Sequence, residues 1–281
     1  MTDYYSFWGK AQPENPTGSA YHLLAYHSLD VAAVGRVLLQ RDKQMRQRLL
    51  AKTCLDESVL LSLVTFFLSL HDLGKFAEGF QNLRPELFAA LRGCASTKAY
   101  TVRHDSLGYL LWSRAVWLKG LEQGWLRTGD GTEDVYSWGD ILSTWLQAAC
   151  GHHGEPPRSN IHGMSLSLQF DSHFNAEAKE AAVAYTKEVA GFLVRQGFLS
   201  LAWRDELEGL FPRASWLLSG LTILSDWIGS NTTFFPYHTE TLPLEEYWRR
   251  FALPQAEAAM TAFGVLPPPP SKTTGMASLV L

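Results

Sequence analysis

The sequence predicts an all-α protein, because apolar residues recur at helical spacing in several segments and strand signals are few. Segment 59–70 is apolar almost throughout, which predicts a helix buried on every side. In segment 23–39, one helical face, at spacings i, i+4, i+7 and i+11, is made of His27, Val31, Val34 and Leu38. We therefore expect a helical bundle organised around segment 59–70.

The remaining elements follow from the same periodicity along the chain. Further helices are predicted at residues 85–91, 102–118, 141–150, 176–196, 216–228 and 244–264, the last one interrupted at Pro254. Residues 41–52 should form a charged helical connector, and 1–20, 122–139 and 159–175 should be irregular. We expect one domain over residues 1–264 and a polyproline linker or tail over 265–281.

Composition narrows the class of protein. With 46% hydrophobic and 19% charged residues, the chain of 281 residues is typical of a globular protein. A formal net charge of −4 argues against a globally basic nucleic-acid binder and leaves a local basic groove open. The three cysteines form no CxxC pair, which fits a reducing compartment. No signal peptide is evident, and the apolar run is too short to span a bilayer, so we expect a cytoplasmic protein without a membrane segment.

Several ligand-type side chains stand at the ends of apolar helices or on helix-breaking turns. His71 and Asp72 follow the apolar segment 59–70, and polar groups taken out of water need partners. Taken singly, such a pair is more often a hydrogen-bonded plug of a core helix than a metal site. The other candidates, in separate segments, are His27, His104, His152, His153 and Asp226. His162 and His173 lie in a polar stretch and receive no role.

Together these candidates supply five imidazoles and two carboxylates. Helical bundles build metal sites from side chains on facing helices, which predicts a metal site in the core of this bundle. The set is large enough for two ions if one carboxylate bridges them. Mixed nitrogen and oxygen donors suit Mn, Ni, Co or Fe better than Mg alone, which stays a further candidate. Two ions about 3.5–4 Å apart are a common device for hydrolysing phosphoesters.

The order of these motifs, H…HD…H…HH…D, resembles that of the HD phosphohydrolase superfamily. Four local motifs are most similar to the HD nuclease domain of the type I CRISPR helicase–nuclease. They are YHSLDVA at 26–32, LHDLGKF at 70–76, GHHG at 151–154 and SDWIGS at 225–230. The similarity runs from Trp8 to about residue 262. It departs at VRHDSLG, residues 102–108, where the family often reads NHG.

This resemblance implies a role for each candidate residue. One ion would be held by His27, His71, Asp72 and Asp226. Asp72 would bridge to a second ion, which would be held also by His104, His152 and His153. Lys75 would face the phosphate and stabilise charge in the transition state, so Asp72 and Lys75 are the expected catalytic residues.

The resemblance also implies a function. It is that of a metal-dependent nuclease that cuts single-stranded DNA during CRISPR interference, with a helicase domain or subunit and the CRISPR surveillance complex as partners. No G-x-x-x-x-G-K-[ST] phosphate loop occurs in the sequence, so the helicase must lie elsewhere. Low net charge and the 10 Trp, 10 Tyr and 15 Phe residues favour single strands over duplex. The alternatives are an HD-type nucleotide phosphohydrolase acting on dNTPs or cyclic nucleotides, and a non-catalytic, metal-stabilised binding module.

Overall fold

A computed structural model describes residues 4–12, 19–126, 135–161, 163–194 and 207–264 of the chain. Within them the fold is all-α, as predicted. The α-helices are α1 (Leu24–Arg41), α2 (Lys43–Thr53), α3 (Glu57–Ser69), α4 (Glu78–Gln81), α5 (Pro85–Arg92), α6 (His104–Leu111), α7 (Trp117–Glu122), α8 (Val135–Cys150), α9 (Phe170–His173), α10 (Ala176–Leu193), α12 (Leu207–Gly229), α13 (Leu244–Tyr247) and α14 (Leu253–Phe263). Four 3-10 turns are η1 (Tyr4–Ser6), η2 (Leu73–Phe76), η4 (Gly151–His153) and η5 (Leu166–Gln169).

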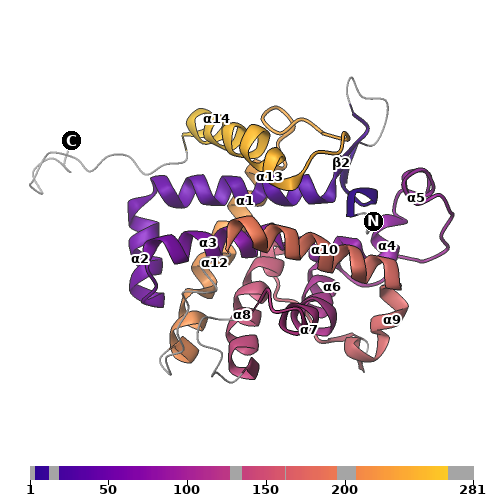
Figure 1. Cartoon of the computed structure of the whole chain (residues 1–281), viewed down its shortest axis with the longest axis horizontal. Coiled ribbons are helices and arrows are strands. Elements are labelled where there is room, and N and C mark those ends of the chain that lie inside the picture. Colours follow the sequence, from indigo (N-terminus) through magenta and orange to yellow (C-terminus); the bar gives the residue numbers. More distant parts are fainter. Residues whose placement is uncertain (1–3, 13–18, 127–134, 162, 195–206, 265–281) are drawn as a thin grey trace, which may run out of the picture.

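Helix α3 lies at the centre of the bundle. It packs against α1, α8 and α10, and α12 in turn packs against α1 and α8. Figure 1 shows α1 and α3 one above the other across the middle of the molecule, with α13 and α14 covering α1 and with α8 and α12 extending below. The segment Glu57–Phe76 is long and apolar enough to cross a membrane, but 89% of its most apolar 18-residue window is buried inside the protein. It is therefore the core helix that the sequence predicts.

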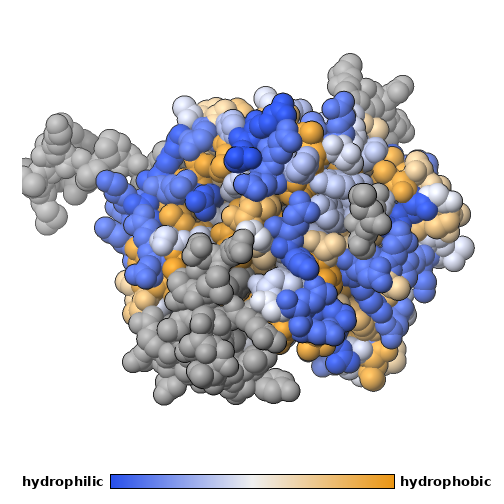
Figure 2. Space-filling view, viewed as in Figure 1, coloured by the Kyte–Doolittle hydropathy of each residue, from blue (hydrophilic) through white to orange (hydrophobic). Residues whose placement is uncertain are grey.

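The surface of the described residues fits the interpretation of α3 as the core helix of a globular protein. On the face drawn in Figure 2, hydrophilic side chains dominate and the hydrophobic patches are separated from one another. The predicted tail, 265–281, lies outside the described residues.

Two parts of the sequence that we expected to be irregular contain short strands, so those predictions are corrected. Strand β1 (Trp8–Ala11) pairs antiparallel with β2 (Tyr21–Leu23), and β3 (Asn160–Ile161) pairs with β4 (Met164–Ser165). Strands of two to four residues are too short to show the alternating pattern by which strands are predicted. The segment after β4 also contains η5 and α9.

Two further expectations were wrong for identifiable reasons. Helix α8 begins at Val135, inside the segment 122–139 that was predicted to be a loop. Its Gly139 packs closely on Trp117, since a Cβ there would lie 3.0 Å from the Trp117 indole nitrogen. Pro254 does not interrupt the last helix, because a π-helical turn, Trp248–Ala252, precedes it and places the proline in the first turn of α14. A proline there loses no intrahelical hydrogen bond.

A glycine contact fixes the distance between η2 and α6. A Cβ on Gly74 would lie 1.9 Å from the carbonyl oxygen of His104 and 2.5 Å from the nitrogen of Gly108. Backbone therefore touches backbone, and no side chain fits between the turn that follows Asp72 and the helix that begins with His104.

We predict that Gly74→Ala lowers the free energy of unfolding by about 3 kcal/mol, because the added methyl group can only be accommodated by moving one backbone segment. Urea denaturation of the two proteins measures this difference. The matched control is Gly191→Ala in α10, where the new Cβ meets nothing within 4 Å. That variant should be neutral or more stable by about 0.5–1 kcal/mol. Equal unfolding midpoints for Gly74→Ala and the wild type would contradict the proposed backbone contact.

Candidate metal centre

The carboxylate of Asp72 lies at the meeting point of four helices and the turn η4. Asp72 follows the end of α3 and is 1% exposed. Histidines approach it from α1, from the end of α3, from the start of α6 and from η4. Asp226, on α12, lies next to the first two of these histidines. All seven ligand candidates named from the sequence are thus found in one place.

The first group of donors surrounds Oδ2 of Asp72. Nε2 of His27 lies 3.1 Å from this oxygen, and Nε2 of His71 lies 3.2 Å from it. Oδ1 of Asp226 completes the group, 3.5 Å from Nε2 of His27 and 3.7 Å from Nε2 of His71. Both imidazoles are fully buried, whereas the Asp226 side chain is 14% exposed. His27, His71 and Asp72 have donor atoms close enough together to hold one ion.

The second group of donors faces the other oxygen of the same carboxylate. Oδ1 of Asp72 lies 3.3 Å from Nε2 of His104 and 3.7 Å from Nε2 of His152. Nε2 of His153 is 2.9 Å from Nε2 of His104. These three histidines form a second set whose donor atoms could hold an ion, and His153 lies at the surface. Asp72 is the residue that both sets share.

Helix ends orient two of the imidazoles in the same way. Nδ1 of His71 lies 2.9 Å from the carbonyl oxygen of Leu68, and Nδ1 of His152 lies 3.0 Å from that of Ala149. Each carbonyl belongs to the last turn of the preceding helix, where carbonyl groups have no intrahelical donor. A proton held on Nδ1 leaves the lone pair on Nε2 free to bind a cation. The two histidines therefore present Nε2 to Asp72 because helices α3 and α8 end where they do.

His104 is held by a side chain instead. Its Nδ1 lies 2.9 Å from the hydroxyl of Tyr100, which also accepts a hydrogen bond from the His104 backbone N–H at 2.8 Å. Two contacts to one hydroxyl fix both the start of α6 and the orientation of the imidazole. Sequence reasoning did not identify Tyr100, since nothing in the loop before α6 marks it.

Burial and charge leave most of these groups in the protonation state that binds a cation. Burial lowers the pKa of His27 to about 4 and that of His152 to about 3. Burial would raise the pKa of Asp72, but the cations of Lys75 and His71 hold it well below its ordinary value. Burial alone would lower the pKa of His71, yet the charges of Asp72 and Asp226 raise it to about 9 in the metal-free protein. Asp72 is thus ionised and the imidazoles of His27 and His152 are neutral, whereas His71 is protonated at neutral pH and must lose that proton before its Nε2 can bind a cation.

The donor set fits a divalent metal ion. Within the described part of the chain, both ring nitrogens of His27, Nε2 of His71 and Oδ1 of Asp72 are buried without a hydrogen-bond partner, while Oδ2 of Asp72 has an ion pair with Lys75. Buried polar atoms of this kind are rare, because each one forfeits the hydrogen bonds it made in water. A cation between the imidazoles and the carboxylate would satisfy most of these atoms at once. The residues therefore could hold divalent metal.

Strand β1 contributes to the centre and was missed in the sequence as a source of functional residues. Gln81 binds Trp8 through three hydrogen bonds: the backbone and indole N–H groups of Trp8 donate to it at 3.1 Å each, and its amide donates to the Trp8 carbonyl at 2.9 Å. The next carbonyl, that of Gly9, accepts a hydrogen bond from Nζ of Lys75 at 3.1 Å. Nζ of Lys10 lies 3.8 Å from Oδ1 of Asp226. The sequence feature that could have pointed to β1 is the tripeptide WGK, residues 8–10, at which the resemblance to the family begins.

Lys75 lies inside the centre, not at its surface. It is 5% exposed, and its Nζ is 2.6 Å from Oδ2 of Asp72. The aromatic ring of Phe80 lies beneath the ammonium group, 5.2 Å from it. In this arrangement the charge of Lys75 compensates that of Asp72.

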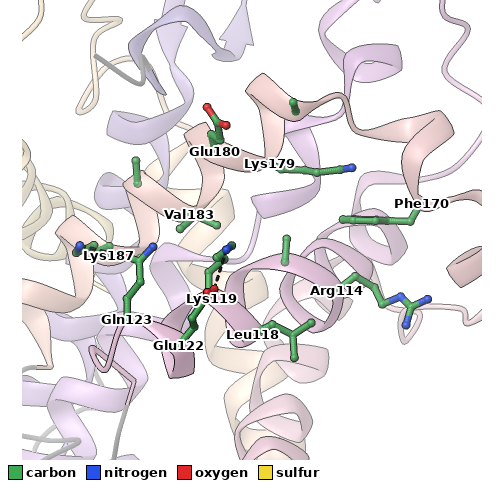
Figure 3. A pocket seen from close by; sticks show the side chains of 13 residues that line it. Arg114, Leu118, Lys119, Glu122, Gln123, Phe170, Lys179, Glu180, Val183 and Lys187 are labelled. Carbon is green, nitrogen blue, oxygen red and sulfur yellow. Dashed lines mark hydrogen bonds and ion pairs between the residues drawn. The ribbon is translucent and has the colours of Figure 1, made fainter.

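Histidines without a predicted role lie elsewhere. His173 is in neither candidate set, and His162 is outside the described residues. A groove of about 820 Å³ runs between α7 and α10, and Figure 3 shows Lys119, Lys179 and Lys187 along it. Its lining contains no histidine or cysteine, and neither candidate set of metal ligands lies in it.

Comparison with known proteins gives one consistent family. Residues 8–235 match the family described as "Cas3, HD domain". The CRISPR-associated endonuclease/helicase Cas3 of Escherichia coli (strain K12) is 27% identical over 242 residues, which cover 81% of this chain and 26% of that protein. The CRISPR-associated nuclease/helicase Cas3 of Streptococcus thermophilus is 32% identical over 93 residues, covering 31% of this chain and 10% of the relative.

Solved structures share the fold. The Thermus thermophilus Cas3 HD domain, crystallised in the presence of Ni²⁺, has a TM-score of 0.58 and 24% identity, covering 94% of this chain and 92% of its own. The chain spans only about a quarter of the E. coli relative. The match over residues 8–235 nevertheless covers most of the sequence. This chain belongs to the Cas3 HD domain family.

Proposed function

We propose that this chain is the metal-dependent nuclease part of a type I CRISPR effector and that it cuts single-stranded DNA. The observation that carries the proposal is the carboxylate of Asp72, which presents one oxygen to each of two sets of histidines. Family membership gives this arrangement its context, since the curated relatives are named nuclease/helicase or endonuclease/helicase.

The donor geometry supports two ions. One would be held by His27, His71, Asp72 and Asp226, and the other by Asp72 with His104, His152 and His153. Such mixed donors favour Mn, Ni, Co or Fe, with Mg a further candidate. The related Thermus thermophilus HD domain was crystallised in the presence of Ni²⁺, which fits that preference.

When bound, divalent ions supply an activated water and positive charge that stabilises a phosphate in its transition state. The protein's own groups prepare this chemistry. The Leu68 and Ala149 carbonyls hold protons on Nδ1 of His71 and His152 and so keep Nε2 free. Asp72 sets the position of both imidazole sets, and Lys75 balances its charge. His153 and the partly exposed His104 mark the side from which a strand can reach the centre.

The relatives support the proposed partners. The curated relatives combine nuclease and helicase in one protein, and this chain spans a fraction of their length. One solved structure of the same fold belongs to a CRISPR RNA-guided surveillance complex before nicking. We therefore include in the proposal a helicase domain or subunit and the surveillance complex as partners, action in the cytoplasm, a nuclease domain over residues 1–264 and a linker or tail over 265–281.

The nuclease proposal predicts that the purified protein, supplied with Mn²⁺, Ni²⁺ or Co²⁺, cuts circular single-stranded DNA. Asp72→Asn should slow cutting by about 10²- to 10³-fold or more, since both donor sets lose their shared charge. Gel analysis of the circle, with duplex DNA and a dNTP panel in parallel, measures the substrate class. Phosphate release from dNTPs with intact DNA would show a nucleotide phosphohydrolase, and bound metal without any turnover would show a binding module.

A second prediction concerns metal binding itself. Isothermal titration with Mn²⁺ should show two sites in the wild type. His153→Ala should weaken one site by about 100-fold and leave the other nearly unchanged, because His153 contacts only the second set. Asp72→Asn should weaken both sites. His173→Ala, outside both sets, is the matched control. Equal loss at both sites in His153→Ala would contradict the division into two sets.

A further inference from the structure

We propose that Lys10 is a phosphate-binding residue of this nuclease, which holds a backbone phosphate of the DNA strand beside the metal centre. The inference rests on the proposed nuclease function and adds a contact to substrate that neither the motifs nor the metal ligands include. Its observations are the position of Lys10, its exposure and the way β1 is attached to the centre.

Lys10 reaches the centre from the solvent side. Its Nζ lies 3.8 Å from Oδ1 of Asp226, and that oxygen is within 3.7 Å of Nε2 of both His27 and His71. The side chain of Lys10 is 30% exposed. Among the described residues no other carboxylate lies within ion-pair distance of it. A cation that touches both water and the edge of the donor set is within reach of a phosphate bound at that edge.

Lys75, in contrast to Lys10, is not exposed to solvent at the edge of the donor set. Its side chain is 6% exposed, and its Nζ contacts Asp72 at 2.6 Å and the Gly9 carbonyl at 3.1 Å. A buried ammonium that already has an ion pair and a hydrogen bond has little capacity left for a third anionic partner. Of the two lysines at the centre, Lys10 is therefore the one that can bind substrate directly.

The strand that carries Lys10 is fixed to the same residues that build the centre. Trp8 is bound to Gln81, and the Gly9 carbonyl is bound to Lys75. A Cβ on Gly9 would lie 2.9 Å from Cα of Leu24 and 3.2 Å from Cβ of His27, so β1 lies directly against the start of α1. The backbone of Lys10 is thus anchored, while its side chain is partly exposed to solvent.

The ion pair of Lys10 with Asp226 is weak enough to be exchanged for a contact with phosphate. At 3.8 Å it is longer than a hydrogen bond, and ion pairs of partly exposed groups contribute little to stability. Once Asp226 ligates a cation, its negative charge is compensated and it attracts the ammonium group less. The three donors of Lys10 are then available to phosphate oxygens, for which lysine acts as a mobile point charge.

A structural role for Lys10 makes a different prediction. If Lys10 served only to neutralise Asp226 in the metal-free protein, its loss would alter metal affinity or stability and leave DNA affinity unchanged. If Lys10 binds phosphate, its loss should weaken DNA binding and leave metal binding nearly as it was. The two roles therefore separate in binding measurements.

The test uses Lys10→Ala, Lys10→Arg and the control Lys52→Ala. Lys52 is a surface lysine at the end of α2, just before α3 begins, whereas His71 follows the opposite end of α3. Binding of a fluorescein-labelled oligothymidylate is followed by anisotropy in an Asp72→Asn background at several salt concentrations, and KM and kcat are measured with Asp72 intact. We expect Lys10→Ala to raise Kd and KM about tenfold and to reduce the slope of log K against log salt by about 0.7, the loss of one phosphate contact. Lys10→Arg should restore affinity to within about threefold.

The outcomes separate this inference from the proposed function. If the wild type cuts DNA and Lys10→Ala binds and cuts it with unchanged Kd, KM and salt slope, Lys10 is not a phosphate-binding residue. If Lys10→Ala instead loses Mn²⁺ affinity in titration while DNA binding is retained, the residue serves the metal ligands. A wild type that cuts no nucleic acid with any metal overturns the nuclease function, while the anisotropy series still decides whether Lys10 contacts a strand.

Discussion

The carboxylate of Asp72 imposes the main constraint on this fold. A carboxylate that is 1% exposed cannot stay ionised without compensating partners, since the loss of its hydration costs several kcal/mol or more. Here the compensation comes from one lysine and four imidazoles, which are supplied by α1, α3, η2, α6 and η4. Each of these segments must therefore end or begin at a fixed point around one side chain. The arrangement of the helices is inseparable from the chemistry that Asp72 can support.

The scaffold achieves this convergence by simple means. Helices α3 and α8 each end two residues before a histidine, and a carbonyl from the last turn of the helix orients its imidazole. The contact between Gly74 and the start of α6 brings His104 to the second oxygen of Asp72. Strand β1 holds Lys75 by a backbone carbonyl. The metal-binding geometry is thus produced largely by backbone, which fixes it more rigidly than long side chains would.

Much of this could be predicted from the sequence, and the reasons differ from residue to residue. The apolar run before His71 and the helical face that carries His27 are strong periodic signals, so α1 and α3 were predicted within a few residues. Convergence of the seven candidate ligands was predicted from the way helical bundles build metal sites. Their division between two ions rested on the resemblance, because spacing along the chain carries no information about contacts between remote helices. Tyr100 was missed although it contacts His104 only four residues further along the chain, and Lys10 lies in the WGK tripeptide, to which no role was assigned. Pro254 misled the prediction because a π-helical turn accommodates it, which periodicity cannot reveal.

The measurement that tests the central claim most directly is anomalous diffraction from crystals of the protein grown with Mn²⁺. If Asp72 is shared by two donor sets, the anomalous difference map will contain two peaks about 3.5–4 Å apart with the Asp72 carboxylate between them. One set of histidines should face each peak. A map with no peak at Asp72, or with metal bound only at other histidines, would contradict the account.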